Sequence, residues 1–413
     1  MTGRPGSRRR WEVIHRPIPH GLVHWRYLTA RPPDALARQR CLWLAARHGP
    51  RPFWWALESY LYLKWQLWRG PASVWRAVRG LGPAVRNEEG IGLLAQGWAV
   101  ARLSLSYCLP PYEIYRYRLY RAKNRAQVVT LVYDQTLAAF HRGRNDPGDA
   151  TRQSLFLLGD KELLTAELSS AGVPMAPILT VARRGSGTPL ASLVSEGEAV
   201  FCKPRHGSGG RGAFTARLSG RVLTVDAVDG SRYSGAAAEA YWSRLLQDDD
   251  MVVQPRLSAH PDVGDLATVD DIVTVRYITE RVSPATGDGT GIRCYCATLE
   301  LPCGTDRMSP WPSYVIVEVD PDSGDILGFP EEYLRGEDIV EYRRVLTQAG
   351  HRRVPAMDCI RQASQIAHHS CPGVHAIAWD WAITPDGPLL LEGNSGWAVD
   401  TPQQLKGGLL TPR

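Results

Sequence analysis

The stretch HAIAWDWAITPDGPLLLEGN at residues 375–394 decides the fold of this chain. Its two apolar halves flank a Thr-Pro-Asp-Gly turn, so the stretch predicts a β-hairpin. If the pairing is centred on Asp386, Asp380 and Glu392 lie directly opposite each other on one face of the sheet, where cross-strand Cβ atoms are roughly 4.5–5.5 Å apart. Asn394 points to the same face, because side chains alternate along a strand.

Two carboxylates and an amide oxygen gathered in this way are typical of a site for a hard cation. Mg²⁺ binds a few protein oxygens and shares its remaining positions with substrate phosphates, so Asp380, Glu392 and Asn394 are candidate ligands. The alternative is the solvent face of an ordinary edge hairpin. The hairpin alone leaves both interpretations open, and a second cluster upstream favours the cation site.

The second cluster is a glycine-rich loop between two predicted strands, in AVFCKPRHGSGGRGAF at residues 199–214, with Lys203 on the first strand. Backbone N–H groups of such a loop point into one concavity and bind phosphate. A strand follows the loop in place of a helix, which disfavours the Walker and Rossmann motifs. The pattern favours a flap over a triphosphate, and the alternative is a plain hairpin. The loop glycines are Gly207, Gly209, Gly210 and Gly212.

Lysine is scarce, because only five of the 48 lysine and arginine residues are lysine. In a chain so rich in arginine, a lysine indicates a position that needs a compact point charge instead of a planar fork. Lys203 precedes the glycine loop, and Lys161 follows Asp160 at the start of a predicted helix over 160–172. For Lys161 the alternative is a solvated charge in a first helical turn.

In this order, the motifs resemble those of ATP-grasp enzymes over residues 150–405. Three segments narrow the resemblance to the sugar-transfer-associated ATP-grasp group: QPRLSAHP at 254–261, TVRYIT at 274–279 and LLEGNSG at 390–396. The resemblance implies an α/β (α+β) fold in which antiparallel sheets grip ATP, preceded here by a helical N-terminal extension. The chain departs from some relatives after the asparagine, where it has Ser395-Gly396-Trp397 in place of an arginine.

The resemblance also implies roles for single residues. The expected metal ligands Asp380, Glu392 and Asn394 would hold one or two Mg²⁺ ions, with Mn²⁺ as a substitute. Arg276 and Lys203 would be catalytic, with Arg276 facing the transferring phosphoryl group or a carboxylate; the alternative is an exposed strand arginine. The expected ATP contacts are Lys161, Lys203 and the glycine loop for the phosphates, Gln254 with the backbone of Val253 and Pro255 for the adenine, and Asp262 or His260 for the ribose.

The reaction implied by the resemblance is an ADP-forming ligation of a carboxylate to an amine through an acyl phosphate, in natural-product or cell-surface glycan biosynthesis. Such an enzyme needs positioning and cancellation of charge more than a protein nucleophile. Its partners would be a small-molecule carboxylate and an amine or hydroxyl acceptor. One alternative is a kinase that phosphorylates an alcohol at the same site. Another is a non-catalytic ATP-binding scaffold, which the intact set of lysines and metal ligands disfavours.

The N-terminal part of the chain has a different composition. Residues 1–125 hold 22 Lys plus Arg against 6 Asp plus Glu, a balance of +16, and nine of the 14 tryptophans. Apolar residues recur at helical spacing, which predicts helices over 34–48, 53–69, 71–79 and 91–107. The favoured interpretation is a helical cap with most tryptophans buried; the alternative is a surface for an anionic substrate or membrane. No nucleic-acid motif is present.

The predicted domains follow from these contrasts. They are a basic Trp/Arg-rich helical region (1–125), the N-terminal part of the grasp (126–198), an ATP-lid subdomain (199–258) and a C-terminal catalytic subdomain with the metal site (259–413). Residues 128–134 are expected to form a strand. The cysteines show no paired CxxC spacing, and no run of 18 or more apolar residues occurs. We therefore expect a cytoplasmic protein with reduced thiols, peripheral to a membrane if the basic region binds one.

Overall fold

The computed structural model describes residues 24–46, 51–207, 209–282, 291–305, 312–330, 333 and 337–411. The chain divides into two compact units. The first comprises residues 1–144, 330–339 and 398–413, and the second comprises 145–329 and 340–397. In this division residues 126–144 and the C-terminal segment group with the N-terminal region.

The described part of the first unit is helical. Its apolar core is built from α4, α5, α6 and the turns that follow, with Val85, Val100, Ile114 and Leu131 fully buried. The helices are α2 (Ala35–Ala45), α3 (Arg51–Lys64), a π-helical turn (Trp65–Arg69), α4 (Gly70–Glu89), α5 (Leu93–Tyr107), α6 (Pro111–Arg116), α7 (Asp134–Arg144) and α14 (Asp400–Lys406), with 3₁₀ turns at Trp25–Leu28 and Ala122–Val129.

Three local predictions in this unit are wrong. The helices predicted over 53–69 and 71–79 are not separate: a π-helical turn at Trp65–Arg69 is followed directly by α4, whose first turn tolerates Pro71 because a proline there has no helical hydrogen bond to lose. Helix α4 then continues to Glu89 with Pro83 inside it, well past the predicted end at 79. The expected strand at 128–134 is also absent: the 3₁₀ turn ends at Val129 and α7 begins at Asp134.

The tryptophans of this region are mostly exposed, which contradicts the favoured interpretation of a tryptophan core. Among those whose side chains the structure describes, only Trp43 and Trp65 are buried, each 2% exposed. The exposed fractions of the others range from 44% to 76%, and these residues are Trp25, Trp55, Trp68, Trp75 and Trp98. Within the described residues, no helix has the length and apolar character needed to cross a membrane.

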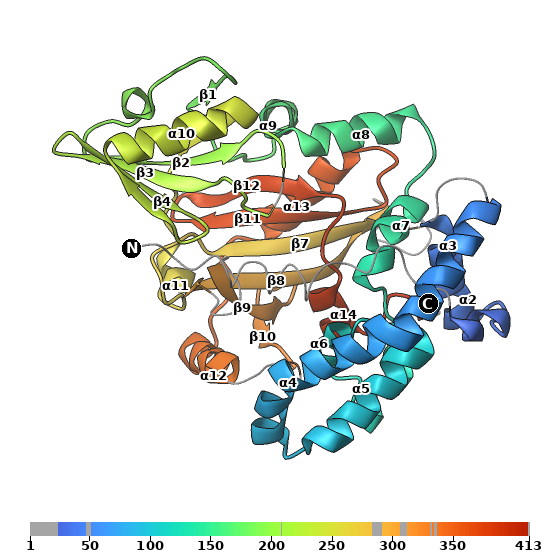
Figure 1. The fold of residues 1–413 in the computed structure, drawn as a ribbon. Coiled ribbons are helices and arrows are strands. Elements are labelled where there is room, and N and C mark those ends of the chain that lie inside the picture. Colours follow the sequence, from blue (N-terminus) through green and yellow to red (C-terminus); the bar gives the residue numbers. More distant parts are fainter. Residues whose placement is uncertain are drawn as a thin grey trace. The chain divides into compact units, whose positions relative to one another are not determined.

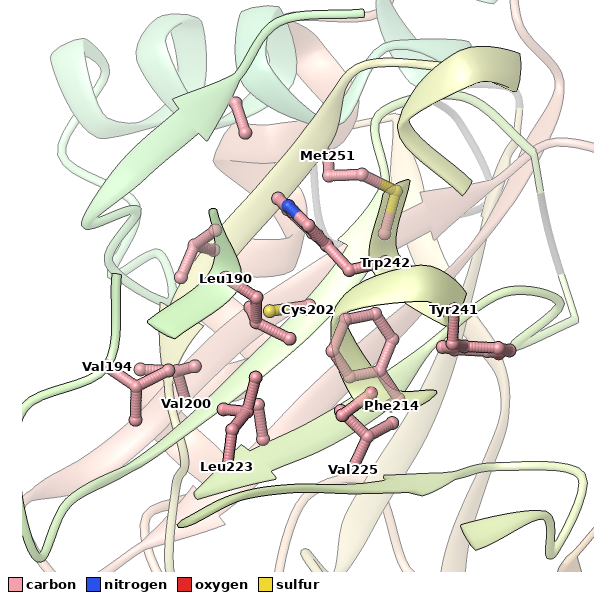
Figure 2. Packing of buried hydrophobic residues seen from close by; sticks show 14 of the residues in the cluster. Leu190, Val194, Val200, Cys202, Phe214, Leu223, Val225, Tyr241, Trp242 and Met251 are labelled. Carbon is pink, nitrogen blue, oxygen red and sulfur yellow. The ribbon is translucent and has the colours of Figure 1, made fainter. Parts of the chain in front are cut away.

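The second unit contains two six-stranded antiparallel sheets (Figure 1). The first sheet has the order β1-β6-β2-β3-β4-β5. Helix α10 packs on it, and its Trp242 and Tyr241 meet Phe214 edge-on in a core that also contains Cys202 and Met251 (Figure 2). The strands are β1 (Thr180–Ala182), β2 (Ala199–Pro204), β3 (Phe214–Ser219), β4 (Val222–Ala227), β5 (Arg232–Ser234) and β6 (Met251–Pro255), and α10 spans Ala236–Asp248.

The second sheet has the order β10-β9-β8-β7-β11-β12, with α13 packed against β7, β8 and β11. Its strands are β7 (Thr274–Arg281), β8 (Ile292–Thr305), β9 (Pro312–Val319), β10 (Ile326–Gly328), β11 (Ala376–Thr384) and β12 (Gly387–Asn394). The remaining helices are α8 (Asp149–Gly159), α9 (Lys161–Ser170), a 3₁₀ turn at Leu190–Leu193, α11 (Pro261–Gly264), α12 (Glu337–Ala349) and α13 (Met357–His369).

Residues 174–176 tie the two sheets of this unit together. Leu390 of β12 donates its N–H to the Pro174 carbonyl and accepts from the N–H of Ala176, at 2.7 and 2.9 Å. The Gln254 side chain, on β6 of the other sheet, donates to the Ala176 carbonyl at 3.2 Å. The connection holds β6 of the first sheet and β12 of the second to one short segment.

Candidate active site

The hairpin β11–β12 pairs Asp380 directly with Glu392 and Ala378 with Asn394, as the sequence predicts. The route to that register differs from the predicted one. Thr384 pairs with Gly387 at the turn, so the pairing is not centred on Asp386, and a β-bulge between Asp380 and Trp381 restores the predicted partners. Leu391 is the extra residue of the bulge, and such a residue is left out of the ladder.

Alternation along β11 places Asp380 on the face away from α13. Its neighbours Trp379 and Trp381 are fully buried, and Trp381 Nε1 donates to Ser364 Oγ of α13 at 3.0 Å. Side chains of successive strand residues point to opposite faces. The two tryptophans therefore fix the strand, and the carboxylate between them faces the other side.

Gly393 lies between Glu392 and Asn394 because the buried indole of Trp379 occupies the space beside it. A Cβ built on Gly393 would meet Trp379 Cζ3 at 2.4 Å. The glycine of the Glu-Gly-Asn sequence is thus required by packing on the face opposite the two polar side chains.

We expect Gly393→Ala to destabilise the protein by about 1–3 kcal/mol, the usual cost of overpacking a filled core. The measurement is urea unfolding followed by circular dichroism. The matched control is Gly396→Ala, since a Cβ at Gly396 meets nothing within 4 Å. Equal midpoints for the two variants would show that the indole moves aside at little cost.

The polar face of the hairpin carries a connected cluster. The Asn394 amide donates to Asp380 Oδ2 at 3.1 Å and to Glu392 Oε1 at 3.2 Å. Arg276 of β7, the register partner of Asp380, holds the same carboxylate with two hydrogen bonds of 2.8 and 3.1 Å. Its third nitrogen pairs with Glu300 of β8 at 3.1 Å. The structure thus brings together all three predicted metal ligands and Arg276.

The Asp380 carboxylate is buried, and its charge depends on those of the partly exposed Arg276 and Glu392 around it. Burial raises the pKa of the Asp380 carboxyl, against the opposing effect of Arg276, and the neighbouring Glu392 adds to the rise. The Asp380 carboxylate in turn raises the pKa of Arg276 above its ordinary value. A cation placed between the two carboxylates would relieve this repulsion.

Lys203 reaches this cluster from the first sheet. Its ammonium donates to the carbonyl of Leu391, the bulge residue, at 3.3 Å. The residue is only 8% exposed. Burial lowers the pKa of Lys203 to about 8, although Glu392 and Asp380 raise it, and the nearby Lys161 lowers it further. Because Leu391 is left out of the β11–β12 pairing, its carbonyl is available to accept the hydrogen bond from Lys203.

Because the pKa of Lys203 is lowered, we expect the affinity for ATP to depend on pH. The charged form predominates in the free protein below about pH 8 and is lost as the pH rises through that value. If phosphates bind the charged form, ATP affinity should be level below pH 8 and should fall above it, and binding there should take up a proton. Calorimetry in two buffers of different ionisation enthalpy measures the uptake. Lys203→Met should remove most of it, and an unchanged uptake in that variant would contradict the assignment.

Lys161 lies where the glycine loop begins. Its ammonium donates to the Gly207 carbonyl at 2.8 Å, burial lowers its pKa, and Glu392 opposes that effect. All four loop glycines have φ between +66° and +98°, a conformation that other residues adopt only with strain. The loop therefore needs its glycines, and one end of it lies beside a lysine that interacts electrostatically with the carboxylate cluster.

Asp160 and Arg205 fix that lysine, and sequence reasoning gave them no role. The Asp160 carboxylate caps α9 by accepting the N–H groups of Glu162 and Leu163 at 3.1 Å. It also accepts two hydrogen bonds from Arg205, just after β2, at 2.8 and 2.7 Å. An acidic residue directly before a helix is a recognisable N-cap signal, but its arginine partner lies 45 residues away. Glu300 was missed for the same reason.

The residues predicted to contact adenine and ribose already make other hydrogen bonds or lie on the surface. The Gln254 amide already donates a hydrogen bond to the Ala176 carbonyl. The Val253 carbonyl accepts the N–H of Leu179 at 2.9 Å. Pro255 ends β6 opposite Val200. Asp262 is exposed and lies beside His260 at the start of α11. The backbone N–H of His260 donates a hydrogen bond to the Ile383 carbonyl near the hairpin turn. These four assignments remain predictions.

The side chains at the centre fit Mg²⁺. Within the described residues, no group of three or more His, Cys, Asp or Glu side chains is placed to hold a metal. Asp380 and Glu392 offer two carboxylates, and Asn394 would add its amide oxygen if the amide, whose nitrogen now donates to both carboxylates, turned toward the ion. That number suits an ion which completes its coordination with phosphates and water, and it does not suit a closed structural site.

No protein-family model and no curated protein matches this chain. Solved structures do. D-cycloserine synthetase DcsG is 16% identical over 62% of this chain and 68% of its own, with a TM-score of 0.34. VanG D-Ala:D-Ser ligase from Enterococcus faecalis is 10% identical over 62% of this chain and 61% of its own, with a TM-score of 0.36.

The ATP-grasp ligase PsnB, solved with a minimal precursor, is 15% identical over 72% of this chain and 71% of its own, with a TM-score of 0.32. The chain spans less than two thirds of the length of VanG. The assignment of the site rests on the strands and side chains of this chain.

Proposed function

We propose that the protein is an ATP-grasp ligase that activates a small-molecule carboxylate with Mg²⁺ and ATP, forms ADP and joins the carboxylate to an amine. One observation carries the proposal. Lys203 from one sheet reaches the hairpin that bears Asp380, Glu392 and Asn394 on the other sheet. This arrangement supports a nucleotide lying between the sheets, with cationic groups toward its phosphates and oxygen ligands toward its metal.

In this proposal the acidic and amide side chains bind the metal ion, and the lysines bind the phosphates. Asp380, Glu392 and Asn394 would hold Mg²⁺, which when bound neutralises charge on the phosphates. Lys203 and Lys161 would bind phosphate oxygens, and the loop from Gly207 to Gly212 would cover them and exclude water from the acyl phosphate. A substrate carboxylate attacks the γ-phosphorus, ADP leaves, and an amine then displaces phosphate.

Arg276 is suited to hold the reacting carboxylate. It is bound on both sides by Asp380 and Glu300. If Asp380 turns to a metal ion, the guanidinium keeps its anchor on Glu300 and has donors available for another carboxylate, for which its planar fork is well matched. We assign Glu300 as a positioning residue for this arginine.

The test is a screen of Mg²⁺-dependent ADP release with pools of amino acids and sugar acids. A ligase needs two co-substrates, the carboxylate and the acceptor, whereas a kinase acting on an alcohol needs one. Release that requires an acid pool together with an amine pool supports the proposal. ADP release with a single neutral alcohol would contradict the ligase proposal and indicate a kinase.

A further inference from the structure

A cavity of about 480 Å³ lies along helix α5 in the first unit, separate from the carboxylate cluster. This volume is within the range of roughly 300–1,000 Å³ that is usual for ligand sites. Ile91, Ala95 and Ala99 give it an apolar part, and three arginines, Arg102, Arg121 and Arg125, line the rest. None of the ten described residues that line it is acidic.

The arginines of this cavity carry charge that is only partly neutralised. Arg121 pairs with Glu89 at 2.7 Å. Arg125 donates to the Tyr120 carbonyl at 3.4 Å, which leaves its charge intact. Neither Arg125 nor Arg102 forms an ion pair with a carboxylate in the described part of the chain. The cavity therefore suits an anionic group, in a region whose net charge is +16 over residues 1–125.

One side of α5 beside the cavity is apolar and exposed. Leu94, Trp98 and Arg102 recur at intervals of four residues, which places them on the same side of the helix. Leu94 is 92% exposed and Trp98 is 75% exposed. Trp98 and Arg102 also line the cavity. A large apolar pair next to a cationic cavity is the pattern of helices that lie in a membrane interface.

We propose that this face binds the surface of an anionic membrane, with a lipid phosphate in the cavity against Arg102 and Arg125, and with Leu94 and Trp98 in the boundary between headgroups and acyl chains. A soluble anion would use the arginines and leave both apolar side chains in water. Burial of such side chains away from water is favourable, so a lipid surface would engage both the arginines and the apolar pair.

The experiment is cosedimentation of the full chain with two kinds of vesicle, phosphatidylcholine alone and phosphatidylcholine with phosphatidylglycerol in equal parts. The protein should bind only the second kind. Arg102→Ala with Arg125→Ala should weaken binding about tenfold or more, since each basic residue near such a surface contributes about 1 kcal/mol. Leu94→Ala with Trp98→Ala should weaken it on a similar scale, and Arg102→Lys with Arg125→Lys should keep most of it.

Matched controls lie in the second unit. Phe156 of α8 is 64% exposed and Arg217 of β3 is exposed, so Phe156→Ala and Arg217→Ala should bind as the parent does. Parent-like binding by either double alanine variant, Arg102→Ala with Arg125→Ala or Leu94→Ala with Trp98→Ala, would overturn the proposal. Absence of binding to phosphatidylglycerol vesicles would do the same. Tight binding of glycerol phosphate in calorimetry, without vesicle binding, would show instead that the cavity takes a free anion.

Discussion

Glu392→Gln should lower Mg²⁺-dependent ADP formation by at least about a hundredfold, the scale of losing one key electrostatic contact at a reaction centre. The substitution keeps the shape of the side chain and its hydrogen bond from Asn394, but it removes a negative charge that the metal needs. The measurement is ADP release under saturating ATP, with thermal unfolding as the check that the fold survives.

The control for this variant is Glu198→Gln, an exposed glutamate just before β2 in the same unit. It should be as active as the parent. If Glu392→Gln retains near-parental turnover that still depends on Mg²⁺, Glu392 is not a metal ligand, and the cluster on β11 and β12 has another role.

Lys203→Arg should weaken ATP binding about tenfold or more, the scale of a lost charge-assisted hydrogen bond of about 1.5–3 kcal/mol. Lys203 is buried and its ammonium lies against the Leu391 carbonyl. A guanidinium is larger and planar, so it does not fit a site shaped for a point charge. Calorimetric titration with ATP and Mg²⁺ measures the change.

Lys64→Arg is the comparison, because the ammonium of Lys64 at the end of α3 donates to the Tyr60 hydroxyl and lies over its ring, away from the glycine loop in sequence. Its effect on ATP binding should be small. Equally small effects at both positions would contradict the inference that a rare lysine in this arginine-rich chain marks a phosphate contact.

The sequence was most informative where the pattern is local. Alternation in the 375–394 stretch and its turn residues predicted the facing of Asp380, Glu392 and Asn394, and the structure confirms that pairing. The bulge at Leu391 was not predictable, because an extra residue changes the register without altering the apolar pattern. The partners of Arg276 were not predictable either, since Glu300 and Asp380 come from strands far apart in the chain.

The helical region was harder to predict for a physical reason. Apolar periodicity shows which side chains share a face of a helix, but it does not show whether that face is covered. Trp43 and Trp98 both occur on helices of this region, yet one is 2% exposed and the other 75%. A tryptophan count therefore suggested a buried core where the structure has an exposed surface.

Trapping the activated carboxylate tests the central claim most directly. With ATP, Mg²⁺ and a pool of acids, hydroxylamine in place of the natural acceptor should convert an acyl phosphate into a hydroxamate. The account predicts hydroxamate formed in step with ADP by the parent protein and strongly reduced in Glu392→Gln. ADP formed at the parental rate with no hydroxamate from any acid would contradict it, because the site would then be transferring phosphate without activating a carboxylate.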